Sequence, residues 1–159
     1  GLMGKQNLYD HSVRVPLIFA GPGIPKGKKV DDPVYLLDIF PTLCDLTGIP
    51  IHESVEGKSL LPRMMESETV PREWLYLAYC DSIRGITNGK TKLIEYACGE
   101  TQLFDLESDP LEKKNLAKNE GEARRLAKMR KILSEMASEW QDAKHPLGKK
   151  FWNSRKDLE

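Results

Sequence analysis

The chain has 159 residues, of which 40% are hydrophobic and 30% are charged, and its 24 basic residues balance its 24 acidic ones. This is the composition of a folded globular protein, and it excludes a disordered or fibrous chain. A net charge of zero provides no general attraction for nucleic acid or an anionic membrane, and no run approaches the roughly 20 apolar residues of a membrane-spanning helix. We therefore expect neither a nucleic-acid partner nor a membrane partner.

A loop and one strand are expected first. Residues 1–10 are polar, flanked by glycine and without a period, which predicts a loop. Residues 13–20 form a nearly continuous apolar run rich in β-branched side chains, as in a strand that is covered on both faces of a sheet. Pro16 cannot donate to a ladder, so one side of the strand's first half is expected to be unpaired.

Two helices are expected next. Apolar residues recur at helical spacing over residues 36–46. Because Pro41 is tolerated only in the first turn of a helix, Asp38 is the expected N-cap, and Gly48 is the expected residue just past the end. A second, shorter helix is expected over residues 59–65, capped by its first residue.

From residue 74 the pattern changes to short strands with alternating apolar and polar side chains. Asn88-Gly89 is a strong hairpin signal, and Gly99 marks another turn. The alternation predicts an antiparallel meander with one face exposed to water. Its four strands are expected over residues 74–79, 82–87, 91–96 and 101–106.

A long amphipathic helix is expected over residues 122–142. Its apolar residues recur in steps of three and four, which predicts that the helix packs on the dry face of the meander. These residues are Leu126, Met129, Leu133, Met136 and Trp140. His145-Pro146 ends the helix, and residues 146–159 are expected to form a tail in which Phe151 and Trp152 dock on the surface or contact another part of a larger protein.

Composition and spacing alone identify little chemistry. There is no Ser/His/Asp spacing, no glycine-rich phosphate loop and no metal-ligand cluster. The three histidines lie in separate segments. Cys44 falls in an apolar helical pattern and is expected in the core, whereas Cys80 and Cys98 are either free thiols or a pair across neighbouring strands.

Five blocks of residues resemble, in the same order, the C-terminal part of the type I sulfatases in the alkaline phosphatase superfamily. The family patterns are H-G-L-x-G-K-x-x-x-Y-E followed by R-V-P-L-I, then D-x-x-P-T-L, G-x-S-L, and L-Y-D-L-x-x-D-P-x-E-x-x-N-L. The matching residues here are 1–18, 38–43, 57–60, 103–112 and 115–116. Several blocks in register are far more specific than one.

The resemblance implies a fold class and a division into domains. The whole protein would be α/β, and this chain would be α+β. Residues 1–70 would be the remnant of the catalytic domain, contributing one strand and helices to its large mixed sheet. Residues 71–145 would form a small antiparallel four-stranded sheet with a long C-terminal helix, and residues 146–159 the tail.

The resemblance also implies site residues. Lys5 matches the family lysine that contacts the sulfate group, where a fixed ammonium group would neutralise charge building on the sulfate oxygens. Tyr9, Asp10 and His11 are candidates for substrate contact, although Asp10 stands where the family usually has glutamate. The implied partner is a sulfated small molecule or glycan.

Other parts of the family's chemistry are missing from this sequence. The family nucleophile is a formylglycine made within C/S-x-P-x-R, and none of Cys44, Cys80 and Cys98 lies in that motif. The divalent cation, usually calcium, is held by residues of the N-terminal part, so we expect no metal ligand in this chain and no cofactor bound to it. This chain alone is therefore expected to be inactive. Family resemblance is consistent with a periplasmic or extracellular protein, but the residues leave the compartment open.

Two alternatives accompany this interpretation. A related phosphatase or phosphonate monoester hydrolase would share the fold, because fold does not fix function. Alternatively, the chain is a non-catalytic truncated module. In the isolated chain the strand over residues 13–20 would lack neighbours, and we expect the chain either to self-associate through that edge or to leave residues 1–10 mobile.

Overall fold

The computed structural model describes residues 5–66 and 72–156, and the chain divides into two compact units. One unit contains residues 1–15 and 76–159, and we call it the sheet unit; the other contains residues 16–75. This division differs from the expected one, because residues 1–15 cluster with the sheet and not with the segment that follows them. In the part of the chain that the structure describes, no helix is long and apolar enough to cross a membrane.

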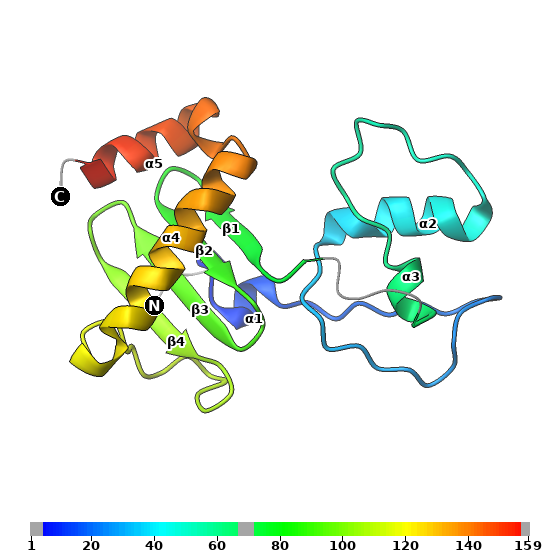
Figure 1. Cartoon of the computed structure of the whole chain (residues 1–159), viewed down its shortest axis with the longest axis horizontal. Coiled ribbons are helices and arrows are strands. Elements are labelled where there is room, and N and C mark those ends of the chain that lie inside the picture. The colour runs from blue at the N-terminus through cyan, green and yellow to red at the C-terminus, as the bar shows by residue number, and fades with distance from the viewer. Residues whose placement is uncertain (1–4, 67–71, 157–159) are drawn as a thin grey trace. The chain divides into compact units, whose positions relative to one another are not determined.

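The sheet unit contains a four-stranded sheet in the order β1-β2-β3-β4 (Figure 1). Its β2–β3 and β3–β4 pairs are antiparallel, with Gly85 opposite Ile94 and Leu93 opposite Leu103. The hairpin at Asn88-Gly89 is confirmed: Gly89 has φ +83°, and the Asn88 side chain accepts the N–H groups of Lys90 and Thr91. The strands are β1 (Leu75–Tyr79), β2 (Ile83–Thr87), β3 (Thr91–Tyr96) and β4 (Thr101–Asp105).

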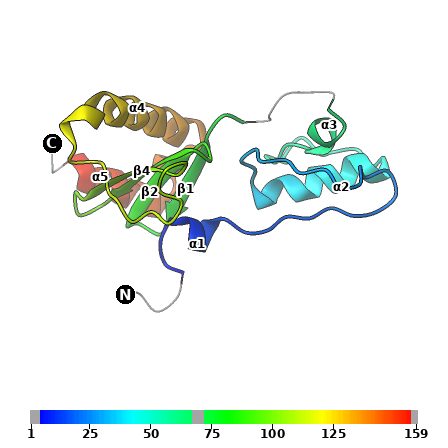
Figure 2. The same ribbon diagram turned by 90° about the horizontal axis from the view of Figure 1, so that it is seen from below.

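The predicted amphipathic helix is confirmed as α4 (Ala123–Glu139), which lies across one face of the sheet (Figures 1 and 2). Met129, Leu133 and Ala137 are buried along the side of the helix that faces the strands. A short 3-10 turn, η2 (Glu120–Glu122), leads into it.

The expected tail is instead a helix, α5 (Pro146–Lys156), which follows the 3-10 turn η3 (Asp142–Lys144). Its Phe151 is completely buried and lies edge-on to Trp152. Pro146 is the first residue of this helix. Proline is tolerated there because the N–H groups of a first turn need no intrahelical partner. The pattern of two aromatics predicted docking but did not predict the helix.

The opposite face of the sheet, expected to be wet, is covered by the N-terminal segment and the one-turn helix α1 (Asp10–Val13), as Figure 2 shows. Buried Leu8 packs there against a cluster that Tyr9 and Val13 adjoin. Both central strands are therefore buried on their two faces. Alternation suggested a wet face because that face also carries Lys92 and Thr87, whose side chains are nonetheless buried. The buried cluster consists of Leu8, Ile83, Ile94, Phe104 and Leu106.

The second unit holds α2 (Ile39–Thr47) and α3 (Leu61–Met64), with the 3-10 turn η1 (Leu36–Asp38) before α2. Asp38 directly precedes α2 as predicted, but its side chain makes no capping hydrogen bond to that helix; Gly48 follows α2 with φ +70°. At the start of α3 the Ser59 hydroxyl accepts the N–H of Leu61 at 3.2 Å, but the N-cap residue is Leu60 and not Ser59 as expected.

The strand expected over residues 13–20 is not formed. Val13 ends α1, and residues 14–20 have no regular secondary structure. A strand exists only where a neighbour completes its ladder, and no described segment of this chain pairs with these residues. Ile18 is accordingly 85% exposed. The apolar run has the composition of a buried strand, but the described part of the chain contains no neighbouring strand to pair with it.

Candidate functional site

The first candidate region is the N-terminal segment that carries Lys5. Residues 1–4, which include the glycine before this lysine, lie outside the described residues. Lys5 itself is exposed, and within the described part of the chain its ammonium group makes no hydrogen bond or ion pair.

Tyr9 and His11 lie close together at the foot of this segment. The Tyr9 hydroxyl donates to Gln102 Oε1 at 2.8 Å, and its ring tilts against Phe104 with 5.7 Å between centroids. The exposed His11 ring stacks on Tyr9 at 5.7 Å. Tyr9 is thus tied to the sheet, whereas His11 remains open to solvent.

Asp10 faces inward and forms an ion pair with Lys92 Nζ. Lys92 lies on β3, is 0% exposed, and also contacts Glu112 Oε1 at 2.7 Å. The second carboxylate oxygen of Glu112 accepts the backbone N–H of Asp10 at 2.6 Å. Three segments far apart in sequence therefore meet at one buried ammonium group. We call Asp10, Lys92 and Glu112 the ionic cluster.

The loop after β4 brings Glu112 to this position. Asp109 accepts the N–H of Lys114 at 2.7 Å, and Asn115 both accepts the N–H of Leu103 and donates to the Thr101 carbonyl at 3.0 Å. Glu112 itself has φ +52°, a left-handed conformation that is strained for a residue with a Cβ. The D-P-x-E-x-x-N pattern thus forms a loop fastened to the sheet edge, with Glu112 directed at the N-terminal segment.

Neither Lys92 nor Glu112 is among the site residues expected from the sequence. A lysine within a predicted strand would ordinarily face water, and no motif contains Lys92. Its position could have indicated burial. Lys92 lies between Thr91 and Leu93 on the third of the four predicted strands, which is central in a meander, and a charge buried there needs a partner.

Two other motif blocks also contact each other, in the unit formed by residues 16–75. The Asp38 carboxylate is fully buried and accepts the N–H groups of Tyr35 and Lys58, together with a guanidinium N–H of Arg72 at 2.8 Å. The Thr42 hydroxyl accepts the N–H of Leu60 at 2.9 Å. The D-x-x-P-T-L and G-x-S-L blocks are therefore held together by buried polar contacts, which gives them a structural explanation.

A second buried charged cluster lies on the helix-covered face of the sheet. Arg84 on β2 donates to Asp142 at 2.8 Å and 3.2 Å and stacks over the Phe151 ring. Tyr76 and the Trp152 indole donate to the same carboxylate. Burial raises the Asp142 pKa, but the hydrogen bonds from Arg84 and Trp152 outweigh it, so the pKa lies below its usual range. This cluster anchors α5.

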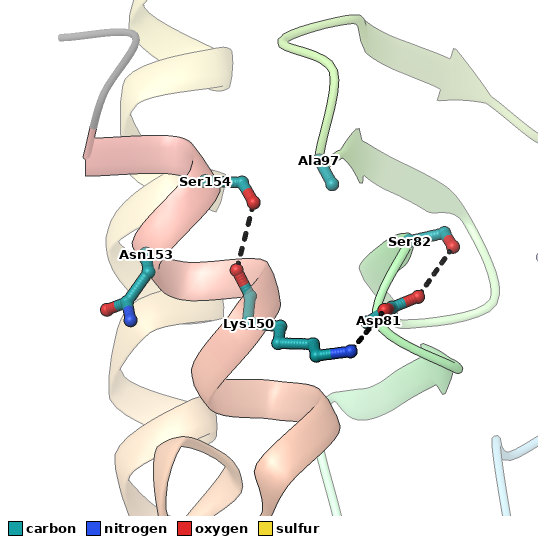
Figure 3. A pocket seen from close by; sticks show the side chains of 6 residues that line it. All are labelled: Asp81, Ser82, Ala97, Lys150, Asn153 and Ser154. Atoms are coloured by element: carbon teal, nitrogen blue, oxygen red, sulfur yellow. Dashed lines mark hydrogen bonds and ion pairs between the residues drawn. The ribbon is translucent and has the colours of Figure 1, made fainter.

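Figure 3 shows a pocket between α5 and the turns that join β1 to β2 and β3 to β4. Lys150 and Asp81 form an ion pair across it at 3.7 Å, and the Ser82 hydroxyl donates to Asp81. Because the two charges neutralise each other, the pocket presents no net charge to an anion. It is lined by Asp81, Ser82, Ala97, Lys150, Asn153 and Ser154.

No group of three or more His, Cys, Asp or Glu side chains that could hold a metal ion occurs among residues 5–66 and 72–156. Cys44 is buried and free, as expected, and Cys80 and Cys98 are exposed free thiols.

The sheet unit is thus a small antiparallel sheet covered by helices on one face and by a motif-bearing segment on the other. Residues 1–139 match the family model described as N-sulphoglucosamine sulphohydrolase, C-terminal. The chain belongs to this family.

Individual relatives agree. A choline-sulfatase of Rhizobium meliloti is 42% identical over 125 residues, covering 75% of this chain and 24% of that protein. A Delta 4,5-hexuronate-2-O-sulfatase of Bacteroides thetaiotaomicron is 34% identical over 148 residues, covering 86% of this chain and 31% of that protein.

Solved structures show the same fold. The crystal structure of a putative sulfatase from Bacteroides thetaiotaomicron has a TM-score of 0.74 at 32% identity, covering 86% of this chain and 32% of that one. A phosphonate monoester hydrolase from Silicibacter pomeroyi has the same TM-score of 0.74 at 23% identity, covering 86% of this chain and 31% of its own. The chain spans about a quarter to a third of the length of the proteins it matches.

Proposed function

We propose that this chain is the C-terminal part of a sulfatase, an enzyme that hydrolyses sulfate esters, and that Lys5 contacts the sulfate group. Membership of the sulfatase C-terminal family over residues 1–139 carries the proposal. The exposed Lys5 ammonium group, on a segment whose following residues are fixed to the sheet, supports it.

The chemistry assigns each of these residues a part. A sulfate ester is anionic, and charge builds on its oxygens as the sulfur–oxygen bond breaks. The ammonium group of Lys5 would neutralise that charge and donate hydrogen bonds to it. Tyr9 and Asp10 are directed at the sheet, so their part would be to hold the segment. Exposed His11 remains the candidate for direct contact with substrate.

The family's calcium ion and formylglycine do not fit the residues described. No described cluster offers the converging oxygen ligands that calcium needs, and no cysteine lies within C/S-x-P-x-R. We therefore assign no step to either group here. Under the proposal they would be contributed by residues outside this chain.

We propose a sulfated sugar or a small sulfated alcohol as the substrate class. The relatives named for hexuronate 2-O-sulfate and for choline sulfate support the two options. Phosphonate monoester hydrolysis is the alternative activity, and the fold shared with such a hydrolase keeps it in consideration.

The test is an assay of the whole protein that carries this sequence on matched aryl sulfate, hexuronate sulfate, choline sulfate and phosphonate monoester substrates. We expect sulfate release, reduced about 10²–10³-fold by Lys5→Ala, as for loss of one preorganised charge-stabilising donor. Lys26→Ala, another exposed lysine on a loop, is the matched control and should leave the rate unchanged.

The outcomes separate the alternatives. Turnover of the phosphonate ester without sulfate release would establish the alternative activity. Neither activity in the whole protein would favour a non-catalytic module. Turnover by the 159-residue chain alone, persisting through purification and abolished by Lys5→Ala, would contradict the proposal that the nucleophile lies elsewhere.

A further inference from the structure

We infer that Lys92 and Glu112 are positioning residues that hold Lys5 in place through Asp10. This inference rests on the proposed function, since it concerns the residue that would contact the sulfate. Neither residue reaches substrate in this role. Both would act through the segment that carries Lys5.

Stability alone gives little reason for the ionic cluster. Lys92 is 0% exposed, and Glu112 is buried beside it. Taking these charges out of water costs free energy that their attraction only partly recovers, and apolar replacements of buried ion pairs are often equally stable. Apolar residues replacing Lys92 and its two carboxylate partners together would extend the apolar cluster that contains Leu8 and Phe104. What the charges add is a defined arrangement of three segments.

The ionic cluster holds Asp10 through two separate contacts. Glu112 accepts the Asp10 backbone N–H at 2.6 Å, while Lys92 binds the Asp10 side chain. The N-terminal segment is therefore bound at both the backbone and the side chain of Asp10, which restrains its rotation as well as its position. Glu112 is held in a strained left-handed conformation to do so.

Further contacts connect the anchored Asp10 to the residues just after Lys5. Asn7 Oδ1 accepts the Tyr9 N–H at 3.1 Å and the Ser12 hydroxyl at 2.7 Å, closing a turn just after Lys5. Leu8 is buried beneath that turn, 3.1 Å from where a Cβ on Gly85 would lie. Residues 7–13 thus form one anchored turn, and Lys5 lies two residues before it in the chain.

The role has a specific kinetic consequence. A misplacement of about 1 Å at a charge-stabilising group can cost on the order of 10²-fold in rate. In the whole protein, Lys92→Met should lower kcat on a sulfate ester about 10–10²-fold, with a smaller change in KM. Glu112→Gln keeps an oxygen that can accept the Asp10 N–H, so it should cause a smaller loss of kcat.

The control is Arg84→Met, which removes a buried cation of the sheet unit on the opposite, helix-covered face. Arg84→Met should lower the free energy of unfolding. It should not change the factor by which Lys5→Ala lowers kcat on the sulfate ester. Lys92→Met should shrink that factor, because once Lys5 is absent nothing remains for Lys92 to position. A loss of the same size in both backgrounds would show a merely structural role and overturn the inference.

Hydrogen exchange of the 159-residue chain provides a second readout that does not depend on activity. The Asp10 amide should exchange faster in Lys92→Met and Glu112→Gln, and at the wild-type rate in Arg84→Met after correction for global stability. Unchanged exchange in both cluster variants would show that the ionic cluster does not hold Asp10. If exchange rises but Lys5→Ala leaves sulfate hydrolysis unaffected, then the proposed contact of Lys5 fails, and the positioning role falls with it.

Discussion

Removal of the Leu133 side chain beyond Cβ tests how α4 contributes to the sheet unit. Leu133 is 2% exposed, with Met129 and Ala137 buried one turn to either side of it. Leu133→Ala deletes three carbons, worth about 2.4 kcal/mol at ~0.8 kcal/mol each, and the cavity left behind adds to this. We therefore expect the free energy of unfolding to fall by about 2.5–5 kcal/mol. For a unit of about 100 residues this corresponds to a Tm lower by more than about 10 °C.

The assay is urea denaturation followed by tryptophan fluorescence in a Trp74→Phe background, which leaves Trp140 and Trp152, both in the sheet unit. Leu111→Ala is the matched control, because Leu111 belongs to the same unit but is 70% exposed. It should change the free energy of unfolding by less than about 0.5 kcal/mol. If Leu133→Ala behaved like this control, α4 would not pack on the sheet as described.

Two further predictions concern the other buried contacts. The hydrogen bonds that lower the Asp142 pKa stabilise the fold fully at pH values above the ordinary Asp pKa of about 4. This stabilisation is lost as the pH falls through the lowered pKa. The stability gap between wild type and Asp142→Asn should therefore narrow in urea melts below about pH 4, and parallel pH profiles would contradict this. A Cβ on Gly57 would lie 2.2 Å from the Leu37 carbonyl oxygen. Gly57→Ala should therefore speed hydrogen exchange of the Lys58 amide. In the control Gly121→Ala, the nearest atom to the added Cβ lies at 3.4 Å, so the neighbouring amides should exchange at the wild-type rate. Equal increases in exchange near both sites would argue against the clash at Gly57.

Where the partners of a pattern lie within the chain, the sequence predicted structure closely. The stripe from Leu126 to Trp140 and the four short strands supply each other's buried surfaces, so period and turn residues were sufficient. The apolar run over residues 13–20 carried an equally clear strand pattern, yet no strand forms there. Local pattern reports which surface a segment must bury, but the ladder that makes it a strand comes from other segments.

The same distinction applies to α2. Its predicted span was confirmed, but of its apolar residues Cys44 is buried while Phe40 and Leu43 are 59% and 49% exposed. In the proposed sulfatase, this face would pack on parts of the protein outside the chain. The helix forms in the structure because Pro41 and Gly48 fix its ends, which are local signals.

The candidate site was predictable only in part, for a physical reason. Resemblance located Lys5 because the residues around it form a contiguous motif. The arrangement that would make Lys5 effective is not contiguous: it depends on Lys92 in the middle of a strand and on Glu112 in a loop beyond the sheet. An ion pair between residues 10 and 92 leaves no periodic or local trace in a single sequence. Under the proposed function, the sheet unit would be the support that orients Lys5, with Lys92 and Glu112 holding the segment that carries it.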